Sequence, residues 1–234
     1  MSYLSDMASV QQIAVTTHGR YLVESPAAGQ SRGLIVGFHG YGESAEAELE
    51  RLQSIPGSRQ WTVVSIQGLH RFYRGRGTQV VASWMTRQDR ELAIDDNIAY
   101  VSAVVAAMRQ EMEIYSPLVF AGFSQGVAMA FRAAGSSATP VSAVLAVGGD
   151  VPPELSTDQI ARLPFVLLGR GNADELYPAA QWEADQARLR AAHIELVALG
   201  FDGGHEWHPD VNRAAAALLE RVDREPAHRR EPAR

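Results

Sequence analysis

Short apolar runs alternate with longer amphipathic segments along most of the chain. The apolar runs are typical of strands buried on both faces, and they lie at 34–38, 61–66, 117–121, 141–147, 165–168 and 194–199. The amphipathic segments predict helices at 44–53, 90–113, 125–134, 179–192 and 211–222. In the helix predicted at 90–113, apolar residues recur at steps of three or four and form one face, at Ile94, Ile98, Val101, Val105, Met108 and Met112.

This alternation of strands and helices predicts the fold class. Strands joined by helices form a parallel sheet, and the helices then cover both of its faces. Residues 13–17 and 21–24 predict a hairpin around His18 and Gly19. We therefore expect an α/β fold with a mostly parallel central sheet and an antiparallel N-terminal edge hairpin. The glycine-bearing stretch 67–88 is expected to be irregular.

Length and composition favour a single domain. The chain has 234 residues, of which 46% are hydrophobic and 21% charged, and these are ordinary values for a globular domain. No repeat or linker interrupts 1–222, whereas 223–234 is charged and contains proline without apolar periodicity. We expect one domain over 1–222 and a disordered tail over 223–234.

Missing residue types exclude several kinds of chemistry. Cysteine is absent, which excludes disulfides, thiolate metal sites and a cysteine nucleophile. All basic residues are arginine, which excludes a Schiff-base lysine and a phosphate-binding P-loop lysine. The net charge of -6 gives no reason to expect a nucleic-acid partner. The N-terminus lacks a secretory pattern and no apolar run could span a bilayer, so we expect a cytoplasmic protein without a membrane span.

The strongest chemical motif lies at residues 122–126, which read GFSQG. An apolar run precedes this G-x-S-x-G pattern and a helical segment rich in small residues follows it, which is the strand–turn–helix context that a nucleophile elbow needs. Ser124 is therefore the predicted nucleophile. Glycines on either side remove Cβ atoms that would collide where the strand and the helix cross.

A serine hydroxyl needs a base, and the expected chain order is serine, acid, histidine. Only His205 and His208 follow a late strand at the correct edge of the sheet, because His193 precedes its strand. We choose His205, since Gly203 and Gly204 let a short loop carry its ring back over the serine. His208 precedes Pro209 at a helix start, where a capping or surface role is the favoured interpretation.

The acid that orients the histidine has two candidates. Asp174 and Asp150 both follow strands, and both fit the chain order. We choose Asp174 because its strand is the last before the histidine-bearing strand; Asp150 precedes two prolines and suits a turn. Glu175 is an adjacent carboxylate that could be mistaken for the acid.

The negative charge that develops during attack needs two amide donors. The first is the N–H of Gln125, at the N-terminus of its helix. The second comes from the loop after the strand 34–38, most simply from the N–H of Tyr41, with Gly40 and Gly42 letting the backbone turn inward. His39 is interpreted as a structural histidine that holds this loop.

The segment after the second central strand interleaves arginines with aromatic residues. Arg71 to Arg76 could contact an anionic substrate group, or could form a solvated loop; a nucleic-acid patch is the weaker interpretation. The predicted substrate pocket uses the apolar and aromatic side chains near it, namely Tyr41, Phe72, Tyr73, Trp84 and Met85. Trp84 and Met85 fit the hydrophobic core equally well.

Together these residues resemble the phospholipase/carboxylesterase family of α/β-hydrolases, which are small single-domain esterases that include acyl-protein thioesterases. The resemblance spans about 33–222. It rests on the loop that begins at His39, on Trp84 before the long helix, on the GFSQG elbow, on 171–178 and on 204–206. The elbow with phenylalanine and glutamine is the most specific of these segments. The arginine-rich segment and the sequence at 205–208 depart from the family.

The resemblance implies an α/β-hydrolase fold and a Ser124–Asp174–His205 triad that hydrolyses carboxylic esters or thioesters without a metal or cofactor. It also implies a monomer or homodimer with a small-molecule ester as substrate. From the residues we expect small or medium acyl groups, released through an acyl-enzyme, because no lid domain is evident. The alternatives are a phospholipase or a peptidase that uses the same triad, or a non-catalytic binding protein of this fold.

Overall fold

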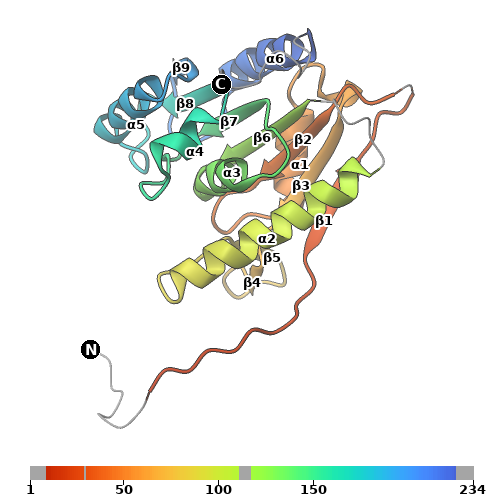
Figure 1. Cartoon of the computed structure of the whole chain (residues 1–234), viewed down its shortest axis with the longest axis vertical. Coiled ribbons are helices and arrows are strands. Elements are labelled where there is room, and N and C mark those ends of the chain that lie inside the picture. Colours follow the sequence, from red (N-terminus) through yellow and green to blue (C-terminus); the bar gives the residue numbers. More distant parts are fainter. Residues whose placement is uncertain (1–8, 29, 111–116, 225–234) are drawn as a thin grey trace.

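A seven-stranded sheet forms the centre of the computed structural model, which describes residues 9–28, 30–110 and 117–224 (Figure 1). Its spatial order is β1 (Arg20–Glu24), β3 (Thr62–Gln67), β2 (Leu34–Phe38), β6 (Leu118–Phe123), β7 (Ala143–Val147), β8 (Phe165–Gly171) and β9 (Glu195–Phe201). Every neighbouring pair is parallel except β1 with β3. The carboxyl ends of the parallel strands therefore share one edge of the sheet.

Helices cover both faces of the sheet, as expected (Figure 1). One face packs against α1 (Ala45–Gln53) and α6 (Pro209–Arg224). The other packs against α2 (Arg90–Arg109), α3 (Gln125–Ser136), α4 (Thr157–Ala161) and α5 (Ala179–Ala191). A 3-10 turn, Ser58–Gln60, follows α1. The mostly parallel α/β architecture is confirmed.

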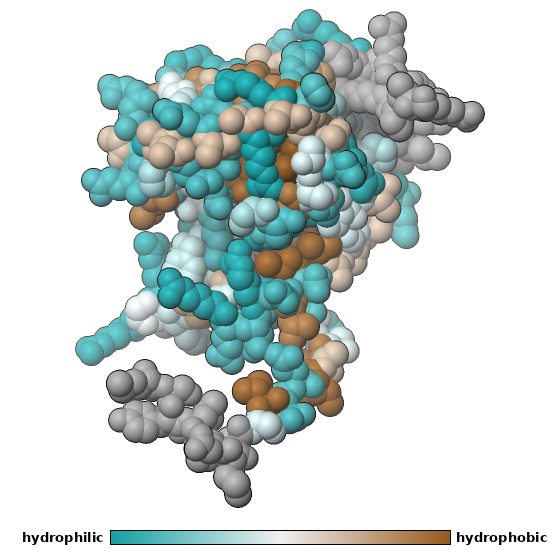
Figure 2. Space-filling view, turned by 60° about the vertical axis from the view of Figure 1, so that its left-hand side comes forward, coloured by the Kyte–Doolittle hydropathy of each residue, from teal (hydrophilic) through white to brown (hydrophobic). Residues whose placement is uncertain are grey.

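Most of the predicted strands and helices are present, because apolar strand residues lie in the core and polar residues cap or cover the helices. The central strands β2, β3, β6, β7 and β8 are buried along their whole length. Helix α1 begins after Ser44, whose side chain accepts a hydrogen bond from the Ala47 N–H and so caps the helix. Polar residues predominate on the face seen in Figure 2, and its apolar residues form small separate groups.

Only half of the predicted N-terminal hairpin forms. The antiparallel edge strand is present as β1, but residues 13–17 are not a strand, and the side chains of Ile13 and Val15 are 88% and 80% exposed. The residue before β1, Gly19, packs closely on α2, since a Cβ atom there would lie 2.0 Å from the ring of Tyr100. The chain passes directly over helix α2 at this point and does not turn back along β1.

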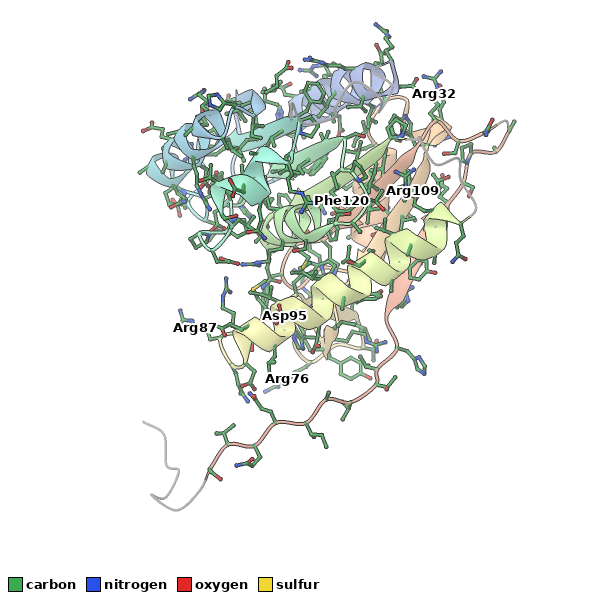
Figure 3. The ribbon with its side chains drawn as sticks, in the orientation of Figure 1. Arg32, Arg76, Arg87, Asp95, Arg109 and Phe120 are labelled. Carbon is green, nitrogen blue, oxygen red and sulfur yellow. The ribbon has the colours of Figure 1, made fainter. Side chains whose placement is uncertain are left out.

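The segment 67–88 is more regular than expected. It contains an antiparallel hairpin of β4 (His70–Tyr73) and β5 (Val80–Ser83), which stands apart from the main sheet. Figure 3 shows Arg76 and Arg87 at the margin of the molecule, away from Phe120 in the sheet. Helix α4 was also not predicted.

Two predicted boundaries reach the limits of the described residues. Helix α2 ends at Arg109, and the predicted helical residues 111–113 lie outside the described part of the chain. Helix α6 continues to Arg224, so Asp223 and Arg224 are helical and do not belong to the predicted tail. Residues 225–234 lie outside the described part. Within it, no helix is both long and apolar enough to cross a bilayer.

Candidate active site

Three side chains that are far apart in the sequence meet at the carboxyl edge of the sheet. Ser124 follows β6, Asp174 lies in the loop after β8, and His205 lies in the loop after β9. The Nε2 atom of His205 is 2.9 Å from the Oγ of Ser124, and its Nδ1 atom is 2.9 Å from the Oδ2 of Asp174. These distances permit a continuous hydrogen-bonded chain from the hydroxyl to the carboxylate.

Ser124 occupies a strained backbone conformation, with φ 53° and ψ -122°. The flanking glycines allow this turn. A Cβ on Gly122 would lie 2.5 Å from the carbonyl oxygen of Gly126, and one on Gly126 would lie 1.8 Å from that of Phe38. No other residue fits at either position without movement of the backbone. The turn therefore presents the hydroxyl at the sheet edge, as a nucleophile elbow requires.

Close contact between two loops places the His205 ring. A Cβ on Gly171, at the end of β8, would lie 2.1 Å from the carbonyl oxygen of Gly204. The imidazole also packs on the ring of Phe123, with centroids 5.0 Å apart. Phe123 immediately precedes Ser124, so the elbow supports the ring that faces its own hydroxyl.

Asp174 is held firmly in its loop. It is 3% exposed, and its Oδ1 atom accepts hydrogen bonds from the N–H groups of Leu176 and Tyr177, both at 2.9 Å. The guanidinium of Arg170 donates to the carbonyl oxygens of Asp174 and Tyr177. Because Oδ1 is occupied by these amides, Oδ2 is left to face His205.

The rejected candidates lie elsewhere or contact other groups. Asp150 is exposed, and within the described residues it has no hydrogen bond to either histidine. The ring of His208 stacks on Phe201 and its Nδ1 accepts the N–H of Asp210, which fits the predicted capping role at the start of α6. Glu175 is exposed. His193 lies between α5 and β9, at the opposite edge of the sheet.

The N–H groups of Tyr41 and Gln125, which the sequence predicts as oxyanion donors, have no hydrogen-bond acceptor within the described part of the chain. Gln125 directly follows Ser124, and Tyr41 lies in the loop after β2. The side chain of Gln125 is itself anchored, since its Oε1 accepts the Trp84 N–H at 3.0 Å and its Nε2 donates to the Met85 carbonyl at 3.2 Å. This anchoring role was not predicted.

The pocket beside Ser124 differs from the predicted one. A cavity of about 340 Å³ opens there, and its lining includes Asp150, Leu176, Tyr177, Pro178 and Gln181. None of the predicted pocket residues lines it. Two of them are core residues, since Trp84 is fully buried and Met85 is 6% exposed. Three of them are exposed aromatic residues, Tyr41, Phe72 and Tyr73.

A hydrogen bond from the indole N–H allows the large apolar ring of Trp84 to be buried in the core. Its indole N–H has a buried acceptor, the carbonyl oxygen of His39, at 2.8 Å. The rings of Tyr41 and Phe72 contact each other at a tilt, with centroids 5.6 Å apart, and neither lines the pocket. The glycine pair after β7, Gly148-Gly149, lines this cavity and is a sequence signal that could have pointed to it, because glycines at this edge allow close approach.

The arginine-rich segment forms the exposed β4–β5 hairpin. Arg71 donates to the carbonyl oxygen of His18, and the residues from Arg71 to Arg76 are exposed and do not line the pocket at Ser124. The structure therefore favours the solvated interpretation over the substrate-contacting one. Among the described residues, no group of three or more histidine, aspartate or glutamate side chains is arranged to hold a metal ion.

A mostly parallel sheet with a serine on a sharp strand–helix turn defines an α/β-hydrolase. The chain belongs to the phospholipase/carboxylesterase family, whose model matches residues 18–215. The resemblance inferred from the sequence is thereby confirmed. Membership in this family makes the protein an enzyme that hydrolyses esters.

Solved structures share the fold at low sequence identity. Esterase PE8 is 21% identical with a TM-score of 0.69, over 88% of this chain and 100% of that one. The Zea mays acyl-protein thioesterase 2 is 19% identical with a TM-score of 0.70, over 88% and 100%. The Bacillus cereus carboxylesterase is 14% identical with a TM-score of 0.68, over 87% and 94%. No curated protein sequence matches the chain.

Proposed function

We propose that the protein is a serine carboxylesterase in which Ser124 is the nucleophile, His205 the general base and Asp174 the residue that orients the imidazole. The observation that carries this proposal is the pair of 2.9 Å contacts that links the Ser124 hydroxyl through His205 to Asp174. A serine hydroxyl is a weak nucleophile until a positioned base removes its proton.

The reaction proceeds in two stages. Ser124 attacks the acyl carbon while His205 takes the hydroxyl proton, and Asp174 stabilises the imidazolium that forms. The N–H groups of Tyr41 and Gln125 bind the oxyanion, and Gln125 lies at the N-terminus of α3, where the helix dipole adds to the attraction. His205 then gives its proton to the leaving alcohol and activates water, which releases the acid from the acyl-enzyme.

The pocket supports small or medium acyl groups as substrates. Its volume of about 340 Å³ lies at the lower end of the range for ligand sites. Asp150 gives the lining an exposed carboxylate, which disfavours substrates with an acidic group beside the scissile bond. Thioester hydrolysis, a monomeric or homodimeric state and a cytoplasmic location remain predictions.

The decisive experiment compares the wild type with Ser124→Ala on p-nitrophenyl acetate. We expect the variant to lose turnover while its melting temperature changes little, because the hydroxyl makes no contact in the core. Labelling of Ser124 by a serine-directed phosphonate, located by mass spectrometry, distinguishes an enzyme from a binding protein. Full activity in the alanine variant would refute the proposal. An acyl-chain series, extended to phospholipid and peptide substrates, then separates an esterase from the alternatives.

A further inference from the structure

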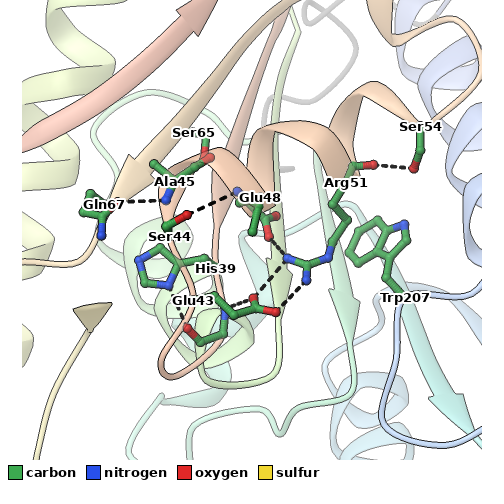
Figure 4. A network of polar contacts seen from close by, with 12 residues as sticks. His39, Glu43, Ser44, Ala45, Glu48, Arg51, Ser54, Ser65, Gln67 and Trp207 are labelled. Atoms are coloured by element: carbon green, nitrogen blue, oxygen red, sulfur yellow. Dashed lines mark hydrogen bonds and ion pairs between the residues drawn. The ribbon is translucent and has the colours of Figure 1, made fainter. Parts of the chain in front are cut away.

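The ionisable side chains of Glu43, Glu48 and Arg51 lie together next to the loop that begins at His39 (Figure 4). The Arg51 guanidinium pairs with Glu43 at 2.8 Å and also with Glu48. The side chain of Glu48 is completely buried, and that of Arg51 is 12% exposed. Burying charges is costly, and an apolar cluster of similar volume is often as stable. Stability alone therefore does not account for this network, and its members also contact the backbone of the loop and the residue before Ser124.

Glu43 and Trp84 fix the peptide that joins His39 to Gly40. The Oε2 of Glu43 accepts the Gly40 N–H at 2.7 Å, and the indole N–H of Trp84 donates to the His39 carbonyl oxygen on the opposite side of the same peptide. Because a peptide unit is planar, bonds to its N–H and its C=O define the orientation of the whole plane.

The next peptide, from Gly40 to Tyr41, is held from its carbonyl side alone. The Nε2 of His39 accepts the Gly68 N–H, so the neutral ring carries its proton on Nδ1 and donates it to the Gly40 carbonyl oxygen at 2.7 Å. Burial lowers the pKa of His39, which keeps the ring neutral. In a trans peptide the N–H points to the side opposite the carbonyl oxygen. The Tyr41 N–H is therefore directed away from the His39 ring.

Arg51 connects this loop to the nucleophile elbow. Its guanidinium donates to both carboxylate oxygens of Glu43, and it lies over the ring of Phe123, 4.4 Å from the centroid. A Cβ on Gly40 would lie 3.0 Å from the Glu43 carboxylate and 3.3 Å from Phe123. Arg51 thus contacts both the Glu43 carboxylate, which holds the loop that carries Tyr41, and Phe123, which precedes Ser124.

We propose that Arg51 and Glu43 are positioning residues that set the spacing between the Tyr41 and Gln125 amides of the oxyanion hole. Neither side chain lines the cavity beside Ser124. Arg51 holds the Glu43 carboxylate, and this carboxylate accepts the Gly40 N–H. The position of Gly40 in turn fixes the Tyr41 N–H relative to the nucleophile elbow. This inference rests on the proposed esterase function.

The test compares Glu43→Ala, Glu43→Gln and Arg51→Lys with the wild type. Loss of one oxyanion donor costs about 10²–10³-fold in kcat, so a displaced donor should cost about 10–100-fold in Glu43→Ala. KM should stay within about twofold, because the hole binds charge that develops only in the transition state. Arg51→Lys keeps the charge but loses the two-pronged contact, and we expect about a tenfold loss.

A short alkylboronic acid reports on the hole directly. Its boron accepts the Ser124 oxygen and becomes a tetrahedral anion, while the hydroxyl proton passes to His205. Its inhibition constant should rise by about the same factor as kcat falls in each variant. Glu43→Gln retains an oxygen that can accept the Gly40 N–H, so it should recover most of the activity that Glu43→Ala loses. If Glu43 and Arg51 contributed only to stability, the variants would have lower melting temperatures, but their boronate inhibition constants would not rise in proportion to the fall in kcat.

Glu46→Gln is the matched control. Glu46 lies on α1, as Arg51 does, but it pairs with Arg20 at the surface. The kcat of the Glu46→Gln variant should therefore equal that of the wild type. Equal kcat in wild type, Glu43→Ala and Arg51→Lys would overturn the proposal, as would a fall in kcat without weaker boronate binding. If Glu43→Ala does not fold, Arg51→Lys provides the same test with the charge balance intact. If kcat is unchanged in the Glu43 and Arg51 variants while Ser124→Ala is inactive, the positioning role is refuted and the esterase proposal still stands.

Discussion

Glu48 should make the protein less stable as the pH rises through neutrality. Its carboxyl is fully buried, and within the described residues its Oε1 atom has no hydrogen-bond partner. Burial raises the pKa of Glu48 from 4.5 to about 7, although the nearby Arg51 opposes the shift. The perturbation that tests this is Glu48→Gln, which keeps the shape of the side chain and removes the titration.

The sign follows from the two pKa values. In the unfolded chain Glu48 releases its proton near pH 4.5, whereas in the folded protein it does so near pH 7. Between these values the folded state binds more protons, so the free energy of unfolding falls as the pH rises and then levels off above about pH 7. From pH 5 to pH 8 the linkage relation gives a loss of roughly 2–3 kcal/mol in the free energy of unfolding, a loss that Glu48→Gln should not show.

Urea unfolding of both proteins at pH 5 and pH 8 measures this quantity. Subtracting the wild-type value from the Glu48→Gln value at each pH cancels most contributions from other titrating groups. Relative to the wild type, the variant should gain roughly 2–3 kcal/mol of stability between pH 5 and pH 8. Glu46→Gln serves as the control, because Glu46 is mostly exposed and its pKa is lowered by Arg20. If the difference in unfolding free energy between Glu48→Gln and the wild type is the same at pH 5 and at pH 8, the argument is refuted.

Other substitutions test the site and the fold. Asp174→Asn should lower kcat on p-nitrophenyl acetate by about 10⁴-fold, whereas Asp150→Asn should leave most of it; a larger loss from the second would reassign the acid. His208→Ala should cost about 1 kcal/mol in urea unfolding through the lost cap and should retain activity. Gly126→Ala should cost about 3 kcal/mol or more, because its Cβ would overlap the carbonyl oxygen of Phe38; unchanged thermal unfolding would contradict the elbow geometry.

The sequence predicts the sheet well because strand burial and helix amphipathicity are local patterns. It fails where a distant residue decides the outcome. The stretch 13–17 has strand-like alternation, yet it forms no strand, and the neighbouring Gly19 packs against Tyr100 on α2, a contact that the local pattern does not reveal. In the hairpin of β4 and β5, the strand β4 is exposed along its whole length and has no core pattern, whereas β5 is buried from Val81 to Ser83. The segment therefore looked irregular in the sequence.

The candidate site was predictable in its chemistry and not in its pocket. Ser124, Asp174 and His205 follow strands that share one sheet edge, and topology alone brings such positions together. The pocket prediction relied on the chemical type of side chains near the site. It failed for Trp84, because an indole that finds a buried acceptor belongs to the core. Whether an aromatic residue lines a cavity depends on contacts that sequence order does not contain.

The second glycine of the GFSQG motif has a consequence beyond the turn itself. Because Gly126 has no Cβ, the first turn of α3 approaches both the Phe38 and His39 carbonyl oxygens, which an added Cβ would meet at 1.8 and 2.7 Å. Gln125 immediately precedes this contact, and the loop that carries Tyr41 begins at it. The width of the proposed oxyanion hole is therefore set by direct backbone contact on one side and by the Glu43–Arg51 pair on the other. Neither amide can move independently without disturbing the packing beside it.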